Sequence, residues 1–165
     1  MKTRMLVAGM LLLILLAGCA LAAPSGISYK DPVAERGTMY EPLPNGDFET
    51  GFFDGWNFDA ETNWRIVSPG IEGNYKAWSN ISYPGRQMYT TVNLTGAEYL
   101  TFKFTQKPGS RIIVRLDDHG IWTTRWCVAR LCYAVVPISG HDGYHKVGIT
   151  GTKYSTVNVD RFILI

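Results

Sequence analysis

Turn-forming pairs that contain glycine interrupt residues 45–143 at short intervals, and they restrict the fold more than any other feature. Glycine accepts a positive φ without a steric clash, so Asn-Gly, Asp-Gly and Pro-Gly pairs mark chain reversals. The pairs are Asn45-Gly46, Asp54-Gly55, Pro69-Gly70, Pro84-Gly85, Pro108-Gly109 and Asp142-Gly143. No stretch between them combines helical caps with a helical period.

The segments between these turns are short and rich in β-branched and aromatic residues. In 99–104 the apolar side chains share one face, whereas Thr101 and Lys103 share the other. This period of two indicates a half-buried antiparallel strand. The last segment alternates in the same way, with a slip near Asp160 and Arg161. The predicted strands are 64–67, 87–94, 99–106, 111–117, 121–128, 131–138, 145–150 and 156–165. Together they predict an all-β antiparallel sandwich.

The first residues predict an export signal. Lys2 and Arg4 precede an uncharged apolar run over 5–23, after which the chain becomes polar and rich in turns. A positive start, an apolar run and small residues in this order are typical of a signal peptide, here a signal helix. An uncleaved membrane anchor is the alternative, because an apolar run of this length can span a bilayer.

The end of the apolar run, Leu16-Ala17-Gly18-Cys19, resembles the lipobox of prokaryotic lipoproteins. The resemblance implies a signal segment over 1–19, a lipid on Cys19 and attachment to a membrane through this lipid anchor. Cleavage at Ala22 or Ala23 is the alternative and leads to simple secretion. Both routes predict an extracytoplasmic protein of the cell surface or envelope.

Charge and composition limit the partners of the mature chain. The sequence has 16 Lys and Arg against 14 Asp and Glu, and two of the bases lie in the leader. The mature chain is therefore neutral and lacks the positive charge on which nucleic-acid binding depends, so we expect no nucleic-acid partner. Residues 20–44 hold four prolines and show no strand or helix period, which predicts an extended linker before one domain over 45–165.

Motifs at both ends of this domain resemble the galactose-binding-like jelly-roll domains, which include many carbohydrate-binding modules. The similarity covers about 43–165 and rests on Asn45-Gly46-Asp47-Phe48-Glu49-Thr50-Gly51, Gly55-Trp56, the strand 87–94 and the closing strand 156–164. It implies an antiparallel jelly-roll β-sandwich and a glycan as the ligand class. It does not name the ligand, because function depends on a site grafted onto the fold.

The first and last strands of a jelly roll are neighbours, which brings Asp47 and Glu49 near Asp160. Clustered carboxylates repel unless a proton or a cation neutralises them, and Ca²⁺ prefers such oxygen ligands. Many of the resembled domains bind a structural calcium at matching acidic positions, so the resemblance implies Ca²⁺ as a structural cofactor, with Glu72 as a further candidate ligand. The alternative is that Asp47 caps a turn and Arg161 or another base pairs with a carboxylate.

Two cysteines remain in the domain, Cys127 and Cys132, with four residues between them. An exported chain favours their oxidation. A tight hairpin between them places the two side chains opposite each other, which suits a cross-strand disulfide. Two buried thiols are the alternative.

Aromatic residues supply the main ligand-binding candidates. Trp122 and Trp126 fall at even spacing on the predicted strand 121–128 and therefore share one face, and Arg115 and Arg125 lie on adjacent stretches. An exposed aromatic pair with polar neighbours can stack on sugar rings. The same face can instead be buried, which is the commoner fate of tryptophan pairs.

Three further aromatic residues, Tyr144, Tyr83 and Trp78, are candidates at loops or at the rim of the sandwich, whereas Trp56 and Trp64 match core positions of the resembled fold. With these residues, the leading hypothesis is a non-catalytic surface module for carbohydrate. A structural or adhesive envelope protein with protein–protein contacts is the alternative, and it needs an exposed apolar patch. We expect no enzyme, because no catalytic constellation can be named.

Overall fold

The structure is a computed structural model, and it describes residues 26–28, 41–60, 62–124, 127 and 131–165. The predicted signal segment, its Cys19, and the ligand candidates Arg125 and Trp126 lie outside these residues. The regular structure of the described residues consists entirely of β-strands. None of them forms a helix that is long and apolar enough to cross a membrane.

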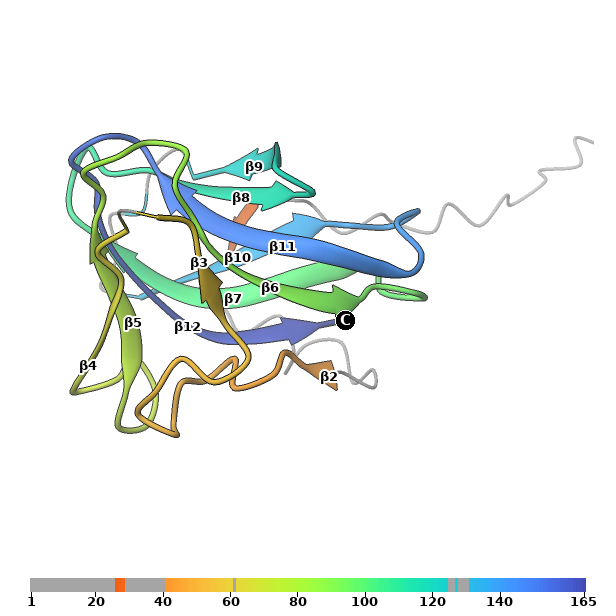
Figure 1. The fold of residues 1–165 in the computed structure, drawn as a ribbon, viewed down its shortest axis with the longest axis horizontal. Coiled ribbons are helices and arrows are strands. Elements are labelled where there is room, and N and C mark those ends of the chain that lie inside the picture. Colours follow the sequence, from red (N-terminus) through yellow and green to blue (C-terminus); the bar gives the residue numbers. More distant parts are fainter. Residues whose placement is uncertain (1–25, 29–40, 61, 125–126, 128–130) are drawn as a thin grey trace, which may run out of the picture.

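The larger of two antiparallel sheets has seven strands. Its order is β1-β10-β7-β12-β5-β4, and β2 pairs with β12 outside this path. Figure 1 shows β2 beside the C-terminal end of β12. The strands are β1 (Gly26–Ser28), β2 (Glu41–Pro42), β4 (Arg65–Val67), β5 (Lys76–Asn80), β7 (Tyr99–Gln106), β10 (Cys132–Pro137) and β12 (Thr156–Leu164).

The smaller sheet has five strands in the order β3-β6-β11-β8-β9. These are β3 (Asn57–Phe58), β6 (Met88–Asn93), β11 (Tyr144–Gly151), β8 (Ile112–Leu116) and β9 (His119–Thr123). The β8–β9 hairpin closes through Asp117 and Asp118, both at positive φ (47° and 69°), as a two-residue hairpin turn requires.

The core lies between the two sheets (Figure 1). Leu100, Phe102 and Phe104 alternate along β7 and are fully buried, as the sequence period predicts. Phe162 of β12 stacks on Phe102 with ring centroids 4.8 Å apart, and it also contacts Trp56 at 5.1 Å. The sandwich is therefore closed by aromatic packing between strands that lie far apart in the sequence.

The prediction of an all-β antiparallel sandwich is confirmed, and seven of the eight predicted strands match to within one residue at each end. The prediction of a strand over 121–128 is correct for 121–123 and wrong for Thr124 and Cys127, which lie outside a strand. The observed strand β9 runs from His119 to Thr123, because the tight turn after β8 lets pairing resume between Leu116 and His119. β3 and β5 were not among the predicted strands.

Two of the unpredicted strands lie inside the predicted linker 20–44. β1 pairs with β10, and β2 pairs with β12. Leu43, which follows β2, is 2% exposed and belongs to the core. Strands of two or three residues are too short to show a period of two, so the sequence pattern could not reveal them.

The predicted slip in the last strand is a β-bulge. The register between β12 and β7 shifts between Asp160 and Ile163, and Arg161 takes a φ of +52°. A bulge re-aims the side chains on either side of it. Here the buried Asp160 precedes the bulge, and Phe162 within it enters the core.

The predicted disulfide is present. Cys127 and Cys132 are joined, with their Cα atoms 6.3 Å apart. Cys132 is the first residue of β10 and is fully buried, so the bond ties the chain that follows β9 to the larger sheet.

Phe162→Ala is expected to lower the free energy of unfolding by about 3–5 kcal/mol, because it leaves a cavity among Phe48, Trp56 and Phe102. Phe52→Ala is the matched control: this side chain is 70% exposed, and its loss should change the free energy by less than about 0.5 kcal/mol. Urea denaturation followed by fluorescence measures both. Equal effects of the two substitutions would contradict the described core.

Candidate functional site

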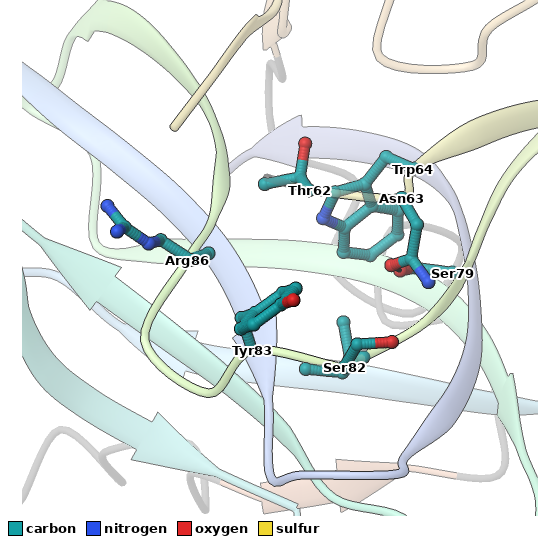
Figure 2. Close-up of a pocket in the computed structure, with 8 residues that line it drawn as sticks. Thr62, Asn63, Trp64, Ser79, Ser82, Tyr83 and Arg86 are labelled. Atoms are coloured by element: carbon teal, nitrogen blue, oxygen red, sulfur yellow. Dashed lines mark hydrogen bonds between the residues drawn. The ribbon is translucent and has the colours of Figure 1, made fainter. Parts of the chain in front are cut away.

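A small hollow lies where the residues before β4, the end of β5 and the loop after β5 meet (Figure 2). Two aromatic rings, an isoleucine and several hydroxyl and amide groups surround it. Its lining residues are Thr62, Asn63, Trp64, Ser79, Ile81, Ser82, Tyr83 and Arg86. The hollow has no space inside it for a water molecule, so it is a shallow feature of the surface and not a cavity.

The loop that carries Tyr83 is held at both ends by hydrogen bonds to its backbone groups. Ile81 N–H donates to the Ser155 carbonyl at 2.8 Å. At the other end, the Arg115 guanidinium donates to the Gly85 carbonyl at 2.8 Å. Ser155 immediately precedes β12 of the larger sheet, and Arg115 belongs to β8 of the smaller one, so contacts near both sheets set the position of this loop.

Tyr83 borders the hollow as an exposed ring. Its side chain is 54% exposed. In Figure 2 it lies across the hollow from Trp64 and Thr62. An aromatic ring held at the surface in this way offers a flat apolar platform with a hydroxyl at its edge.

Trp64 closes the opposite side of the hollow with a buried indole. The residue is 8% exposed, and its Nε1 has no hydrogen-bond partner among the described residues. The neighbouring polar groups are engaged: Ser79 Oγ donates to Asn63 Oδ1 at 2.9 Å, and the Asn63 amide donates to the Asn80 carbonyl. A buried donor without a partner costs about 1–3 kcal/mol, which the packing of the indole has to offset.

Trp122, the first predicted ligand residue, takes the buried alternative. It pairs in register with Val114, whose side chain is fully buried between the sheets. Its ring is partly buried and meets Phe102 edge-on, with centroids 6.1 Å apart. The sequence could not settle this orientation, because it depends on where β9 begins.

Arg115 and Tyr144, also predicted ligand residues, lie on the outer face of the five-stranded sheet and away from Trp122. Arg115 pairs in register with Gly148, and its guanidinium donates to the carbonyls of Asp118 and Gly85. Arg115 therefore positions the loop of the hollow. Tyr144 begins β11 and is 78% exposed.

A second hollow brings the predicted metal ligands together. Asp47, Glu49 and Asp160 line it with Glu72, Gly73 and Arg161. The bulge in β12 and the loop between β4 and β5 form its walls. The predicted gathering of the first and last segments of the domain is thus observed.

Asp160 is the buried member of this acidic hollow. Its Oδ2 accepts the backbone N–H groups of Ile71 and Glu72, each at 2.9 Å. Its Oδ1 is buried and has no hydrogen-bond partner among the described residues. Burial raises the pKa of Asp160 to about 6, although the two N–H groups act in the opposite direction. Oδ1 is therefore an oxygen atom suited to a cation or a proton.

Glu49 and Glu72 already have partners. Backbone N–H groups of Tyr75 and Asn74 donate to Glu49 at 2.8–3.0 Å and lower its pKa. A side chain on Gly73 would collide with this carboxylate, which explains a glycine there. Glu72 bonds to Lys103 and lies 3.0 Å from an Arg161 guanidinium nitrogen.

The contacts that the alternative to calcium expected are present in the acidic hollow. The Asp47 carboxylate accepts the Glu49 N–H at 3.3 Å and caps its turn, and Arg161 pairs with Glu72, as the alternative expected. Asp160 Oδ1, which is buried without a hydrogen-bond partner among the described residues, is not explained by that alternative. No group of three or more Asp, Glu, His or Cys side chains in the described part of the chain is arranged as a metal site. Calcium remains a prediction that rests on Asp160 and on backbone carbonyls.

No protein-family model matches the sequence, and no curated protein matches it. Its fold is similar to solved structures. The K3 cleaved adhesin domain of Lys-gingipain from Porphyromonas gingivalis is 14% identical with a TM-score of 0.57, over 76% of this chain and 98% of that chain. The K2 adhesin domain of Lys-gingipain is 12% identical with a TM-score of 0.55, over 77% and 99%.

A carbohydrate-binding module also has this fold. The C-terminal family 22 module of Clostridium thermocellum Xyn10B is 12% identical with a TM-score of 0.51, over 72% of this chain and 90% of that chain. At these identities the likeness concerns the fold alone. It confirms the resemblance drawn from the sequence, a jelly-roll sandwich of the kind found in carbohydrate-binding modules.

Asp160→Asn is expected to stabilise the protein at pH 7.5 in the presence of a chelator. A carboxyl whose pKa rises from 3.8 to about 6 on folding favours the folded state while protonated, and this contribution is lost as the pH rises through 6. The gain from removing the charge is at most about 3 kcal/mol at pH 7.5 and close to zero at pH 4. Urea denaturation at both pH values measures it, and a gain that is equal at both would contradict the assignment.

Calcium is expected to reverse the order of stability of the wild type and Asp160→Asn at pH 7.5. Millimolar Ca²⁺ should raise the melting temperature of the wild type and leave that of Asp160→Asn unchanged, because the substitution removes the ligand oxygen. A wild type whose melting temperature is the same in calcium and in chelator would remove the calcium prediction.

Proposed function

We propose that this chain is a non-catalytic carbohydrate-binding module whose ligand site is the hollow beside Tyr83. One observation carries the proposal: the exposed Tyr83 ring borders a surface hollow that the hydroxyl groups of Thr62 and Ser82 also line. A sugar presents an apolar face of C–H groups and a rim of oxygen atoms. The first suits an aromatic platform, and the second suits hydroxyl groups at the surface.

Recognition then proceeds through two contacts that the fold has already placed. The sugar ring lies on Tyr83, and its oxygen atoms form hydrogen bonds with the hydroxyl groups of Thr62 and Ser82. The anchored backbone of 81–85 limits the entropy lost on binding, because the loop does not have to be ordered by the ligand.

The comparisons support the ligand class at the level of fold, since one similar structure is a carbohydrate-binding module. The composition of the hollow supports a binding role over a catalytic one. None of the described residues that line it is a carboxylate, a histidine or a cysteine, which are the usual proton-transfer or nucleophilic groups.

An adhesive or structural envelope protein is the second candidate, and a specific surface favours it. Phe52 is 70% exposed, and Phe58 and Tyr75 are each 37% exposed. Gly51, next to Phe52, lies against the Tyr75 ring. Exposed aromatic residues of this kind suit a protein contact, and the two similar gingipain domains are adhesin domains.

The proposal places the module outside the cytoplasm, attached through a lipid on Cys19, with Ca²⁺ as a structural cofactor at Asp160. The lipobox-like sequence and the disulfide support this location. Mass spectrometry of the mature N-terminus tests it: a chain that begins at an acylated Cys19 is the expected result. A chain that begins after Ala22 or Ala23 replaces the anchor with secretion, and one that begins at Met1 overturns cleavage.

Tyr83→Ala is expected to weaken glycan binding about tenfold, because it removes the stacking platform at the surface. Tyr144→Ala is the matched control: it removes a similarly exposed tyrosine on the other candidate face. A glycan array, followed by calorimetry on the best ligand, measures both.

Loss of binding in Tyr144→Ala with full binding in Tyr83→Ala would move the site to the five-stranded sheet. The absence of any glycan signal with the wild type would instead favour the adhesive candidate.

A further inference from the structure

The imidazole ring of His145 lies between two hydrogen-bond acceptors near the start of β11. Its Nδ1 is 2.7 Å from Oδ2 of Asp117, and its Nε2 is 3.1 Å from the backbone carbonyl oxygen of Asp142. A carbonyl oxygen cannot donate, and the contacts with His145 and with the Lys146 N–H lower the pKa of Asp117, so its carboxyl is ionised at neutral pH. A neutral imidazole has one N–H and serves one acceptor, whereas an imidazolium serves both. The geometry therefore fits the protonated ring.

The negative groups that face His145 favour the same protonation state. Asp117 of the β8–β9 turn contacts the ring, and Asp142 of the loop before β11 (138–143) lies close by. They raise the pKa of His145 above its ordinary value of 6.5, chiefly through the hydrogen bond to Asp117 and next through the Asp142 carbonyl. The ring is thus held as a cation by two segments that are far apart in the sequence.

The nearest ammonium group is directed elsewhere. Lys146, the next residue along β11, places its Nζ 2.9 Å from Oδ1 of Asp118 and 3.8 Å from Oδ1 of Asp59. Strand β6 pairs with β11 here through Val92, and none of its residues carries a charge. The positive charge of Lys146 is therefore neutralised by carboxylates of its own.

Two further imidazoles complete the surroundings of the ring. His141 of the loop before β11 meets His145 edge-on, with ring centroids 5.7 Å apart. His119, the first residue of β9, places its Nδ1 2.8 Å from the Asp117 backbone carbonyl and not from the Asp117 carboxylate. The carboxylate contact is thus made by His145.

We propose that His145 forms a pH-sensitive link: its imidazolium joins the β8–β9 turn to the loop before β11, and loss of its proton opens this link. Neutral His145 keeps one of the two hydrogen bonds and loses its charge attraction to Asp117. A group whose pKa is raised on folding stabilises the folded state below its ordinary pKa, and this contribution is lost as the pH rises through the folded value. The link is therefore closed below pH 6.5 and opens as the pH rises through the raised pKa of His145.

The turn made by Asp117 and Asp118 is the part that responds. Both residues take a positive φ (47° and 69°), which residues with a Cβ rarely adopt, so contacts from outside the turn help to hold it. The Asp118 carbonyl accepts a hydrogen bond from Arg115 Nε at 2.8 Å, and the same guanidinium holds the Gly85 carbonyl. Opening of the link therefore extends from the turn towards the loop after β5.

A pH titration of the full chain by NMR tests the link directly. The imidazole signals of His145 should show two protonated nitrogens at pH 5.5 and a midpoint above 6.5. The backbone amide signals of Asp118 and Gly143 should shift with the same midpoint. Asp117→Asn should move the His145 midpoint down towards 6.5, because it removes the contacting charge. A wild-type midpoint at or below 6.5, or amide signals that do not follow the imidazole, would overturn the proposal.

His145→Gln measures what the link contributes to stability. The wild type should have the higher urea midpoint at pH 5.5, and this advantage should disappear at pH 9, where the proton has been lost. The matched control repeats the substitution in the Asp117→Asn background, where its pH dependence should be largely lost because the charged partner is absent. An effect of His145→Gln that is equal at both pH values, or that keeps its full pH dependence in Asp117→Asn, would contradict the link.

Discussion

The pairing of β12 with its neighbours is the constraint on which the rest of the structure depends. This last strand pairs with β7 and β5 and, near its end, with β2, so it joins the two ends of the described domain. Its bulge lets Asp160 support the loop before β5 while Phe162 enters the core. In a regular strand, residues two positions apart point to the same face. The extra residue of the bulge lets Asp160 and Phe162 point to different faces, so that one supports the loop and the other enters the core.

The candidate ligand site depends on the same sandwich at its other end. Ser155, next to the start of β12, holds Ile81, and Arg115 of the five-stranded sheet holds Gly85. Tyr83 lies between these two anchors. Because the loop is held at both ends, little entropy is lost when a ligand binds to the Tyr83 ring. In this way a fold that unrelated proteins share can carry a site of its own.

Local sequence patterns correctly predicted the features that depend on neighbouring residues. They failed for features that depend on contacts between residues far apart in the sequence. Alternation predicted β7, the slip at Asp160 predicted the bulge, and the spacing of Cys127 and Cys132 predicted the disulfide. The inward turn of Trp122 depends on the register that the β8–β9 turn imposes. The sequence assigned Trp64 correctly to the core, but no pattern shows that its N–H lacks a partner, because that depends on groups from the end of β5 and the loop after it.

The two hollows lie at opposite ends of one hairpin, and this arrangement determines how they can influence each other. β4 and β5 pair from Arg65 with Trp78 to Val67 with Lys76. Trp64 and Ser79 border the ligand hollow at one end, and the loop with Ile71 and Glu72 holds Asp160 at the other. A cation at Asp160 would therefore act on the hollow beside Tyr83 through this hairpin and through β12, which pairs with β5 as far as Asn80. Removing the cation should first lower the stability of the protein. It should lower the affinity for a ligand only to the extent that the hairpin loosens.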